Sequence, residues 1–564
     1  MKNITEKIRQ QIKNVVLNSI NKSISNGELP SIEISDILIE TPREKGYGDF
    51  STNVAMQVTR IAKKAPRQIA EIIIKNINIE NTYITKVACA GAGFINFTLD
   101  SQYLYDTLEI IKEEKELYGH INIGNGKKVM VEFVSANPTG PLHMGNARGG
   151  ALGDLIASVL NAAGYDVTRE FLINDAGNQI VKFGNSLEAR YIQLIKGQDA
   201  IEFPEDGYQG EDITEHMREF IKIYGDKYIE VESEERKKVF VDYALPRNLS
   251  QIREGLQSYG VDFDVWFSEQ TLHESKEVDE TIQLLKDRDC TVEHDGAIWL
   301  KGSVIGSDKD EVLVRNNGIP TYFAADIAYH RNKFETRGFE WVINLWGADH
   351  HGHVARMKAA MAAIGINPDK LDVVLFQLVR LYRNGEIARM SKRTGKSISL
   401  MDLVEEVGRD AVRFFFNNKA SGSHLDFDLD LAVKESNENP VFYVQYAHAR
   451  VCSMIKLLES EGIYVPGVKE VKLDLLKEEE ELTLIKKLSE YPDEIRISAE
   501  TLEPSRLTRY VLEVSALFHS FYNACRVRGE EEQLMKARLL LVDCTKIVIK
   551  NVLDLLSISA PERM

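Results

Sequence analysis

Brief apolar and β-branched runs alternate with helical sequence through the middle of this chain. Four such runs are KKVMVEFV (127–134), GYDVTREFLI (164–173), WVINLWG (341–347) and LDVVLFQLVRL (371–381). Strands that alternate with helices pair as a parallel sheet, because each helix carries the chain back to the end from which the strand started. The sequence therefore predicts an α/β fold with a Rossmann-type, doubly wound parallel sheet.

Two further regions flank this sheet. Residues 1–115 open with an amphipathic helix and include ITKVACAGAGFINFTL (84–99), which predicts two short strands in a small α+β domain. From residue 401 to 564 glycine is sparse and helical periodicity dominates, which predicts an all-α helical bundle. The sheet domain then occupies 116–400, and we interpret its long polar stretch, about 187–300, as insertions.

Charge and cysteine usage limit the class of protein. A formal net charge of −17 over 564 residues argues against binding nucleic acid with the whole surface, although it leaves room for local basic patches. The first twenty residues lack an apolar core, and no run of about 18 apolar residues occurs, so we expect no signal peptide and no membrane contact. Five cysteines without a CxxC pair fit a reduced, cytoplasmic protein and argue against structural zinc.

The stretch SANPTGPLHMGNARGG (135–150) follows the first predicted strand. Gly140 and Gly145 have P-loop spacing, but Asn146 and Ala147 stand where a P-loop needs Lys and Ser or Thr. A second fragment, Gly-Lys-Ser at 395–397, lacks the first glycine of that motif. Both half-matches therefore fail as P-loops.

The first fragment still predicts a tight turn before a helix whose unpaired N–H groups can face a phosphate. His143 and Asn146 can donate to phosphate oxygens there, and Gly145 leaves room for a flat base. The alternative is a helix that only caps itself, with His143 on the surface; the joint pattern favours the nucleotide site.

A basic segment follows the last predicted strand. Its cationic residues, set against the single acid Glu386, are Arg380, Arg383, Arg389, Lys392, Arg393 and Lys396. A charge run alone is most often a solvated loop. In a chain this acidic, a run with so few acids favours an anion site.

These motifs resemble those of a known family. HMGN (143–146) resembles the HIGH signature of class I aminoacyl-tRNA synthetases, and RMSK (389–392) resembles their KMSKS signature. Further segments that resemble the arginyl-tRNA synthetases are GDFSTNVAM (48–56), VEFVSANPTGPLHMGNARGG (131–150), FLINDAGNQI (171–180), GIPTYFAADIAYHRNKF (318–334), NLWGADHHGHVARMKAA (344–360), SNENPVFYVQYAHAR (436–450) and SAPERM (559–564). The resemblance covers nearly the whole chain.

The resemblance implies a two-step reaction. L-Arginine and ATP, the latter with Mg²⁺, form arginyl-adenylate and diphosphate, and the arginyl group then passes to tRNA(Arg). The carboxylate of arginine is the nucleophile, so catalysis is mostly positioning and charge stabilisation. The implied catalytic residues are His143, Asn146, Arg389 and Lys392. The implied ATP-binding residues are Pro138, Gly140, His143, Gly145, Asn146, Gly347, Asp349, His350, Met390, Ser391 and Lys392.

The resemblance also implies an arginine pocket. Its residues would be Glu132, Ser135, Asn137, His143, Tyr322 and Asp326. A guanidinium needs planar acceptors, which carboxylates provide. Tyr322 and Asp326 share one face if their segment is helical. The alternatives are a core aromatic for Tyr322 and a helix-surface acid for Asp326.

The sequence departs from the family pattern at three positions. Asn146 replaces the second histidine of HIGH, and Arg389 replaces the first lysine of KMSK. Many relatives lack the second KMSK lysine and carry a lysine just before HIGH; here Gly140 stands before HIGH and Lys392 is present. One cation is therefore kept near the phosphates.

Asp349, His350, His351 and His353 in WGADHHGH suggest a metal site, but a second carboxylate or cysteine group is missing. We prefer a turn at a strand end that contacts the adenosine, and we predict no permanent metal site. Mg²⁺ would arrive with ATP.

The flanking domains resemble tRNA-binding modules. The first resembles the module that meets the tRNA elbow, with Tyr47, Phe50 and Asn53 as candidates. The last resembles the anticodon-binding domain, where Tyr446, Tyr522 and the terminal Met564 are candidates. Core packing is the alternative for either tyrosine. The family suggests a monomer that needs tRNA to activate its amino acid.

Three other classes compete with this interpretation. A P-loop ATPase would need a complete Walker motif. A small-molecule adenylate-forming ligase would share the two signature loops but would leave the C-terminal helices unexplained. A non-catalytic RNA-binding relative should have lost signature residues, yet His143, Gly145 and Lys392 remain.

Overall fold

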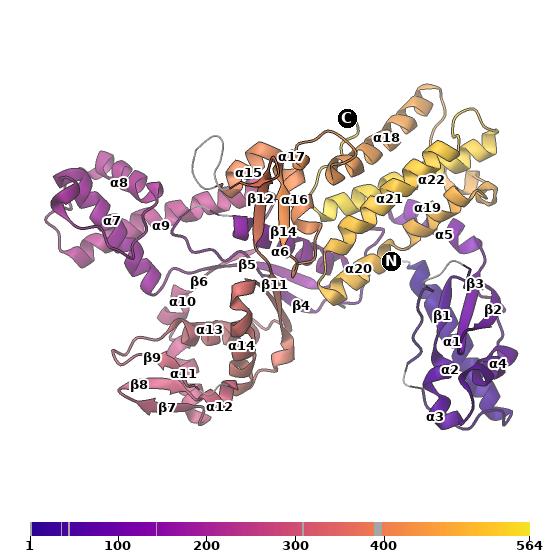
Figure 1. The fold of residues 1–564 in the computed structure, drawn as a ribbon, viewed down its shortest axis with the longest axis horizontal. Helices are drawn as coiled ribbons and strands as arrows, with labels where there is room; N and C mark the ends of the chain where they lie inside the picture. Colours follow the sequence, from indigo (N-terminus) through magenta and orange to yellow (C-terminus); the bar gives the residue numbers. More distant parts are fainter. Residues whose placement is uncertain are drawn as a thin grey trace.

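A five-stranded parallel sheet lies at the centre of the molecule (Figure 1). The computed structural model describes residues 3–34, 36–42, 46–140, 142, 144–306, 309–388 and 398–564. In sheet order the strands are β11 (Leu371–Phe376), β10 (Trp341–Gly347), β4 (Lys128–Glu132), β5 (Asp166–Ile173) and β6 (Val265–Ser268). Every neighbouring pair is parallel, which confirms the predicted fold class.

Helix α6 (Met144–Ala162) follows β4 and is buried along most of its length. Its small residues let it pack closely on the sheet domain: a Cβ at Gly153 would lie 2.2 Å from the ring of Phe133. Two more helices follow strands or turns of this domain, α13 (Tyr322–Arg331) and α14 (His351–Ala363).

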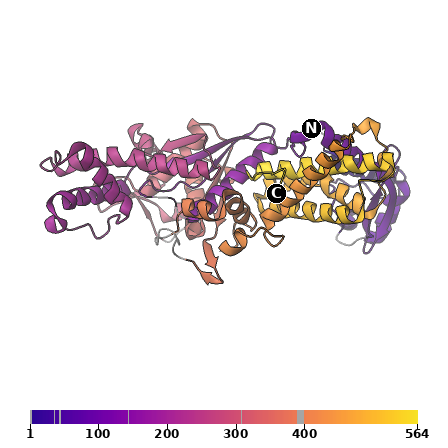
Figure 2. The ribbon, with the colours of Figure 1, turned by 90° about the horizontal axis from the view of Figure 1, so that it is seen from above.

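The interpretation of 187–300 as insertions is wrong at one strand. Helices α7 (Asn178–Lys196), α8 (Glu211–Tyr224) and α9 (Ser233–Ser258) do form a separate unit with its own aromatic core, at one end of the elongated molecule (Figures 1 and 2). The chain then returns to the main sheet as β6, which pairs with β5. Four residues, VWFS, are too short to produce a periodic signal.

After β6 a small antiparallel sheet forms beside the main one. Its strands are β7 (Thr291–His294), β8 (Ala297–Leu300) and β9 (Glu311–Val314), accompanied by α10 (Gln270–Glu274), α11 (Glu277–Asp287) and α12 (Gly302–Ile305). This sheet leads directly into α13.

The run LDVVLFQLVRL divides between two sheets. Its first half is β11, and its second half is β12 (Val379–Arg383), which lies between β13 (Glu386–Ile387) and β14 (Leu425–Asp428). Sheet structure therefore continues past residue 400, beyond α15 (Leu400–Val407) and α16 (Arg409–Asn417) and up to α17 (Leu429–Ala432).

The N-terminal unit lies at the other end of the molecule (Figure 2). It contains α1 (Ile4–Ser25), α2 (Val54–Gln57), α3 (Thr59–Ala62), α4 (Pro66–Asn76) and a sheet of β1 (Phe50–Thr52), β3 (Phe94–Leu99) and β2 (Ile84–Ala90). The two predicted short strands are thus present as β2 and β3, which pair antiparallel. The next helix, α5 (Gln102–Glu114), joins the C-terminal helices: Lys112 pairs with Asp543, and the Tyr105 hydroxyl donates to Leu476 O at 3.1 Å.

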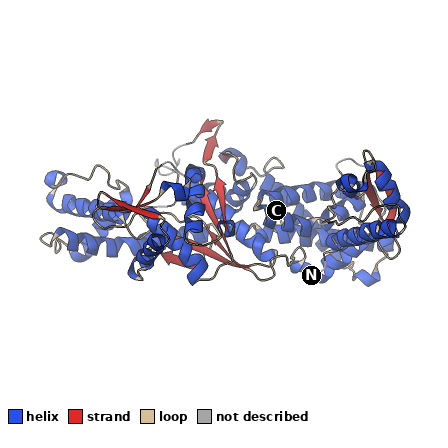
Figure 3. Ribbon diagram, turned by 90° about the horizontal axis from the view of Figure 1, so that it is seen from below, coloured by secondary structure: helices blue, strands red, loops and turns tan. Residues whose placement is uncertain are grey.

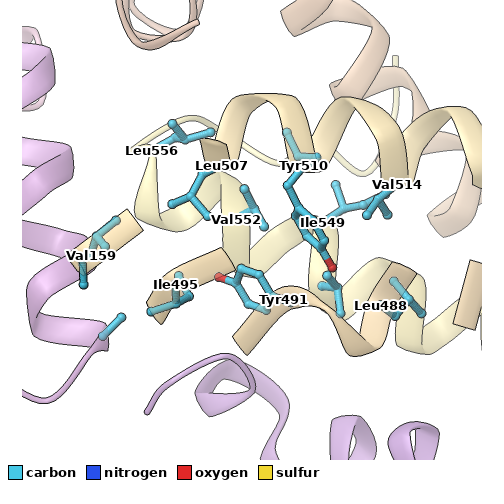
Figure 4. Packing of buried hydrophobic residues seen from close by; sticks show 14 of the residues in the cluster. Val159, Leu488, Tyr491, Ile495, Leu507, Tyr510, Val514, Ile549, Val552 and Leu556 are labelled. Carbon is cyan, nitrogen blue, oxygen red and sulfur yellow. The ribbon is translucent and has the colours of Figure 1, made fainter. Parts of the chain in front are cut away.

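The C-terminal region is helical, as predicted (Figure 3). Its helices are α18 (Pro440–Ser460), α19 (Glu479–Ser489), α20 (Tyr491–Thr501), α21 (Ser505–Ala524) and α22 (Glu532–Leu555). One hydrophobic cluster joins these helices to α6, and Figure 4 shows Val159 of α6 on the side of the cluster where Ile495 of α20 lies. Among the described residues, no helix is both long and apolar enough to cross a membrane.

Candidate active site

The carboxyl ends of the five parallel strands meet at one edge of the sheet, where ligands bind in folds of this type. Glu132 ends β4, Asn174 follows β5, Glu269 follows β6 and Gly347 ends β10. Glu132 and Gly347, which were predicted from widely separated motifs, therefore share one edge of the sheet with Asn174 and Glu269.

The chain leaves β4 through a strained turn. Val134 and Ser135 have φ values of +66° and +39°, a region that a β-branched residue such as valine rarely adopts. The Ser135 amide donates to Phe133 O at 2.9 Å, which closes a γ-turn of the rare positive-φ type around Val134. The Ser135 hydroxyl donates to Glu132 Oε1 at 3.0 Å and accepts from the Leu172 amide of β5 at 3.2 Å.

Side chains from other elements hold the rest of the turn. Asn174 donates to Asn137 Oδ1 at 3.0 Å. Buried Asn248 of α9 donates to Pro138 O at 2.9 Å, and it accepts from His216 Nε2 of α8 at 2.6 Å. The inserted helices therefore support the turn that precedes HMGN.

Gly140 faces the first turn of α8. A Cβ at Gly140 would have the Asp212 carboxylate 3.8 Å away, so the position that carries a lysine in many relatives is open here. Burial raises the pKa of Asp212.

Helix α6 begins at Met144, so Gly145 and Asn146 lie in its first turn, as predicted. Buried Arg148 follows one turn later and donates to three backbone carbonyls beyond β11 and α16: Gln377 O at 2.6 Å, Ser423 O at 2.9 Å and Ala420 O at 3.0 Å. Sequence reasoning did not single out Arg148, because a basic residue in a helix gives no sign of burial.

The chain that follows the second signature meets the residue that precedes the first. His143 is outside the described residues, and so are Arg389, Met390, Ser391 and Lys392 of RMSK. Their neighbours are described: the Leu400 amide, at the start of α15, donates to Leu142 O at 3.2 Å. The segment after RMSK therefore returns to the turn before HMGN.

Tyr322 and Asp326 lie in the first two turns of α13, and the predicted helix is confirmed. The Tyr322 hydroxyl accepts from the Gln179 amide at 3.3 Å, and 45% of the residue is exposed. Asp326 Oδ2 lies 3.3 Å from His353 Nε2 of α14. Both side chains thus occupy the space between α7, α13 and α14.

Glu269 adds a carboxyl that sequence reasoning missed. It follows β6, is only 7% exposed, and its pKa is raised to about 7 by burial and by the nearby charges of Asp326 and Asp175. Carboxyls that gather with little cationic compensation favour a cationic ligand. Because β6 itself was not predicted, the position of Glu269 at the sheet edge could not be foreseen.

Glu132 already has partners. Its Oε2 lies 2.6 Å from the Nζ of Lys333, and its Oε1 accepts from Ser135. Because both of its oxygens are engaged, Glu132 is a poorer acceptor for a guanidinium than Asp326 or Glu269.

The adenosine candidates lie beyond β10. Gly347 ends the strand, and Asp349 and His350 are exposed in the single turn before α14, with Asp349 Oδ2 3.6 Å from His350 Nε2. A Cβ at Gly347 would lie 2.5 Å from Asp349 Oδ1, which is the end of an exposed side chain that can turn away. Within the described ranges, no three His, Cys, Asp or Glu side chains form a metal cluster.

Tyr446, one of the C-terminal candidates, lines a hollow of ≈ 510 Å³ on α18 and α21. The guanidinium of Arg450 lies 4.8 Å from the ring centroid of Tyr446 and 4.7 Å from that of Tyr522. Burial and Arg450 lower the pKa of His519 in this hollow to about 4, so His519 is neutral at physiological pH. Met564 at the chain end is exposed.

One N-terminal candidate is wrong. Tyr47 is exposed, and Asn53 accepts from Gln57 at 2.9 Å in the open turn before α2. The ring of Phe50, however, is buried in β1 and lies under the Arg9 guanidinium, 5.5 Å from ring centroid to Cζ. A ring enclosed in this way cannot stack on RNA.

Models of three protein families match the chain. The "Arginyl tRNA synthetase N terminal domain" matches residues 2–99, the "tRNA synthetases class I (R), catalytic domain" matches 107–435, and the "DALR anticodon binding domain" matches 444–564.

Whole-length relatives agree with these matches. The arginine–tRNA ligase of Ruminiclostridium cellulolyticum is 82% identical and that of Acetivibrio thermocellus 69% identical, each over 564 residues and 100% of both chains. The solved arginyl-tRNA synthetase of Thermus thermophilus shares the fold with a TM-score of 0.74 at 21% identity, covering 98% of this chain and 100% of its own. The Plasmodium falciparum arginyl-tRNA synthetase does so with a TM-score of 0.75 at 20% identity, covering 100% of both chains.

Proposed function

The chain belongs to the class I arginyl-tRNA synthetases, and from this premise we propose that it attaches L-arginine to tRNA(Arg) at the expense of ATP. Arginine and ATP first form arginyl-adenylate and diphosphate; the arginyl group then passes to the tRNA, and AMP leaves. The observation that carries this proposal is the hydrogen bond from Leu400 to Leu142, because it brings the start of α15, which follows the RMSK segment in the chain, to the residue before HMGN.

The acidic pocket would bind the arginine side chain. Asp326 and Glu269 supply carboxylates for the guanidinium, and Tyr322 closes its outer side. Ser135 and Asn137, in the strained turn, would face the α-amino and carboxylate end of the substrate. Glu132 lines the base of the pocket through its contacts with Ser135 and Lys333.

ATP would lie over the start of α6. The positive end of the helix dipole and the donors of His143 and Asn146 meet the phosphates, while the backbone at Pro138, Gly140 and Gly145 allows their close approach. Gly347, Asp349 and His350 would contact the adenosine, and Met390 and Ser391 would shape the opposite wall.

Lys392 and Arg389 would stabilise the charge that develops on the leaving diphosphate. Mg²⁺ would enter as the ATP complex, held by phosphate oxygens.

The two ends of the molecule would bind tRNA(Arg). Tyr446, which lines the C-terminal hollow, would contact unpaired bases together with Tyr522 and Met564, and Tyr47 and Asn53 would contact the tRNA elbow. We propose that residues 1–115, 116–400 and 401–564 act as elbow-binding, catalytic and anticodon-binding domains. The protein would act as a monomer in the cytoplasm.

Arginine-dependent exchange of labelled diphosphate into ATP, with and without tRNA(Arg), tests this proposal. We expect exchange that requires arginine and is greatest when tRNA(Arg) is present. Absence of exchange under both conditions would refute the enzyme assignment.

A further inference from the structure

A lysine that the proposed reaction does not use is fully buried beside the arginine pocket. Lys333 is 0% exposed, and its Nζ contacts Glu132 Oε2 at 2.6 Å, Asn344 Oδ1 at 3.1 Å and the face of the Tyr329 ring at 4.1 Å. An ammonium buried this deeply is tolerated only when it is paired and hydrogen-bonded.

The backbone places Lys333 there by a local irregularity. Directly after α13 the chain makes one π-helical turn, Asn332–Thr336, closed by the Arg337 amide on Asn332 O at 2.9 Å. Such turns are rare and often lie at functional sites. This turn directs Lys333 toward Glu132 of β4 and Arg337 toward Glu170 of β5.

The two carboxylates thus neutralised are direct neighbours. Glu132 and Glu170 are paired positions on parallel strands β4 and β5. Adjacent like charges in a buried sheet would repel each other. Lys333, in the π-helical turn, offsets one of them, and Arg337, directly after the turn, offsets the other. The π-helical turn therefore places two cations where the two strand ends carry two carboxylates.

Hydrogen bonds extend from Lys333 to both walls of the pocket. On one side Asn344 donates to His330 Nε2 at 2.9 Å, and His330 Nδ1 donates to Asp326 O at 2.8 Å, in the backbone of α13. Burial lowers the pKa of His330, so the ring stays neutral and this tautomer is fixed. On the other side Glu132 holds the Ser135 hydroxyl, in the strained turn.

We propose that Lys333 is a positioning residue of the arginine pocket, acting through Glu132 to hold the 134–135 turn at a fixed place relative to α13. This inference rests on the proposed function, because α13 and the turn are the two surfaces between which arginine would bind. Lys333 itself, being fully buried, touches no substrate.

Four forms of the chain test the inference in the exchange assay with tRNA(Arg) present: wild type, Lys333→Met, Glu132→Gln and the double variant. Lys333→Met leaves a buried carboxylate unpaired, and we expect the arginine KM to rise by about 10- to 100-fold while the ATP KM changes by less than about threefold. The arginine KM of the double variant should be no higher than that of Glu132→Gln alone, because Lys333 acts through the Glu132 carboxylate.

The matched control is another buried ion pair, Arg236 with Glu188 at 2.7 Å, in the inserted helices. Arg236→Met should lower the melting temperature but leave the arginine KM unchanged. An unchanged arginine KM in Lys333→Met would overturn the inference. So would a double variant whose arginine KM rises by the product of the increases in the two single variants.

Two further measurements keep the inference testable. If Lys333→Met does not fold, Asn344→Leu removes the second acceptor of the ammonium and should raise the arginine KM about tenfold; no rise overturns the inference. Calorimetry of arginine binding to each variant gives the same comparison without depending on adenylate formation. A wild-type chain that binds arginine but shows no exchange contradicts the proposed function alone.

Discussion

At the scale of single residues, the carboxyl of Glu269 links recognition of arginine to pH. Burial and the charges of Asp326 and Asp175 raise its pKa to about 7, so the empty pocket holds a proton below neutral pH. A guanidinium beside Glu269 would favour the ionised form, and binding would release this proton. Affinity for arginine should therefore be lost as pH falls through about 7.

We expect the arginine KM of the wild type to be about tenfold higher at pH 6 than at pH 8, because about a tenth of Glu269 is ionised at pH 6. Glu269→Gln should raise the KM at pH 8 and remove most of this dependence. Exchange kinetics between pH 6 and pH 8 provide the measurement, and an equally steep dependence in the variant would contradict the role of Glu269.

Glu269→Gln, which should weaken arginine binding, should make the fold more stable at high pH. A carboxyl whose pKa is raised by folding does not lower the free energy of unfolding at a pH below its pKa in the unfolded chain. Its destabilising effect on the fold grows as pH rises from about 4.5, the unfolded pKa, to about 7, the folded pKa. Glu269→Gln should therefore stabilise the fold at pH 8 by about 1–3 kcal/mol. Denaturant unfolding at pH 8 and pH 4.5 measures the difference, which should vanish at the lower pH.

If Lys392 serves the phosphates as we propose, Lys392→Ala should mainly slow formation of the adenylate, because it removes that cation from a chain that has glycine at position 140. The expected loss in exchange rate is about 100-fold or more, with a smaller change in the arginine KM. Unchanged exchange in this variant would exclude Lys392 from the chemistry.

Motifs predicted some residues of the candidate pocket but not others. Tyr322 and Asp326 share a helical face as the spacing predicted, because local periodicity determines that geometry. Glu269 and Lys333 were missed because each owes its place to a feature without periodic signal, a four-residue strand and a π-helical turn. Phe50 was misjudged because an aromatic in a motif can equally be a core residue.

At the scale of elements, the inserted helices support the chemistry as well as adding surface. Asn248 of α9 and His216 of α8 reach the Pro138 carbonyl, in the turn that leads to HMGN. The sequence showed this region only as a polar stretch, since a contact between residues 110 positions apart leaves no local pattern.

Asn248→Ala should raise the ATP KM by about fivefold or more, because it frees the Pro138 carbonyl and leaves the His216 ring without its partner. Binding of arginine should change little. Steady-state exchange with ATP as the varied substrate measures the effect, and an unaltered ATP KM would show that the turn holds its shape without α9.

At the scale of the whole molecule, one hydrophobic core runs from α6 into the C-terminal helices (Figure 4). The helix that would face ATP is therefore packed against the region that would bind the anticodon. Buried Arg413 of α16 strengthens this junction: it pairs with Asp154 of α6 at 2.5 Å and donates to Leu556 O at 2.7 Å, just after α22. Domain order could be predicted from composition, but this shared core depends on packing that only the fold reveals.

Tyr446→Ala should raise the KM for tRNA(Arg) about tenfold, the effect expected for loss of one stacked base, and leave the arginine KM unchanged. Ile455→Ala, a change in the core of the same helix, is the control for general destabilisation. Aminoacylation kinetics separate the two substrates, and an unchanged tRNA KM would place the anticodon elsewhere.

The central claim is that this chain joins arginine to tRNA(Arg). Transfer of radiolabelled arginine to acid-precipitable tRNA, in the presence of ATP and Mg²⁺, tests it most directly. We predict labelling of tRNA(Arg) with arginine but not with citrulline or lysine, and none without ATP. A purified, folded chain that leaves tRNA(Arg) unlabelled under these conditions would contradict the account.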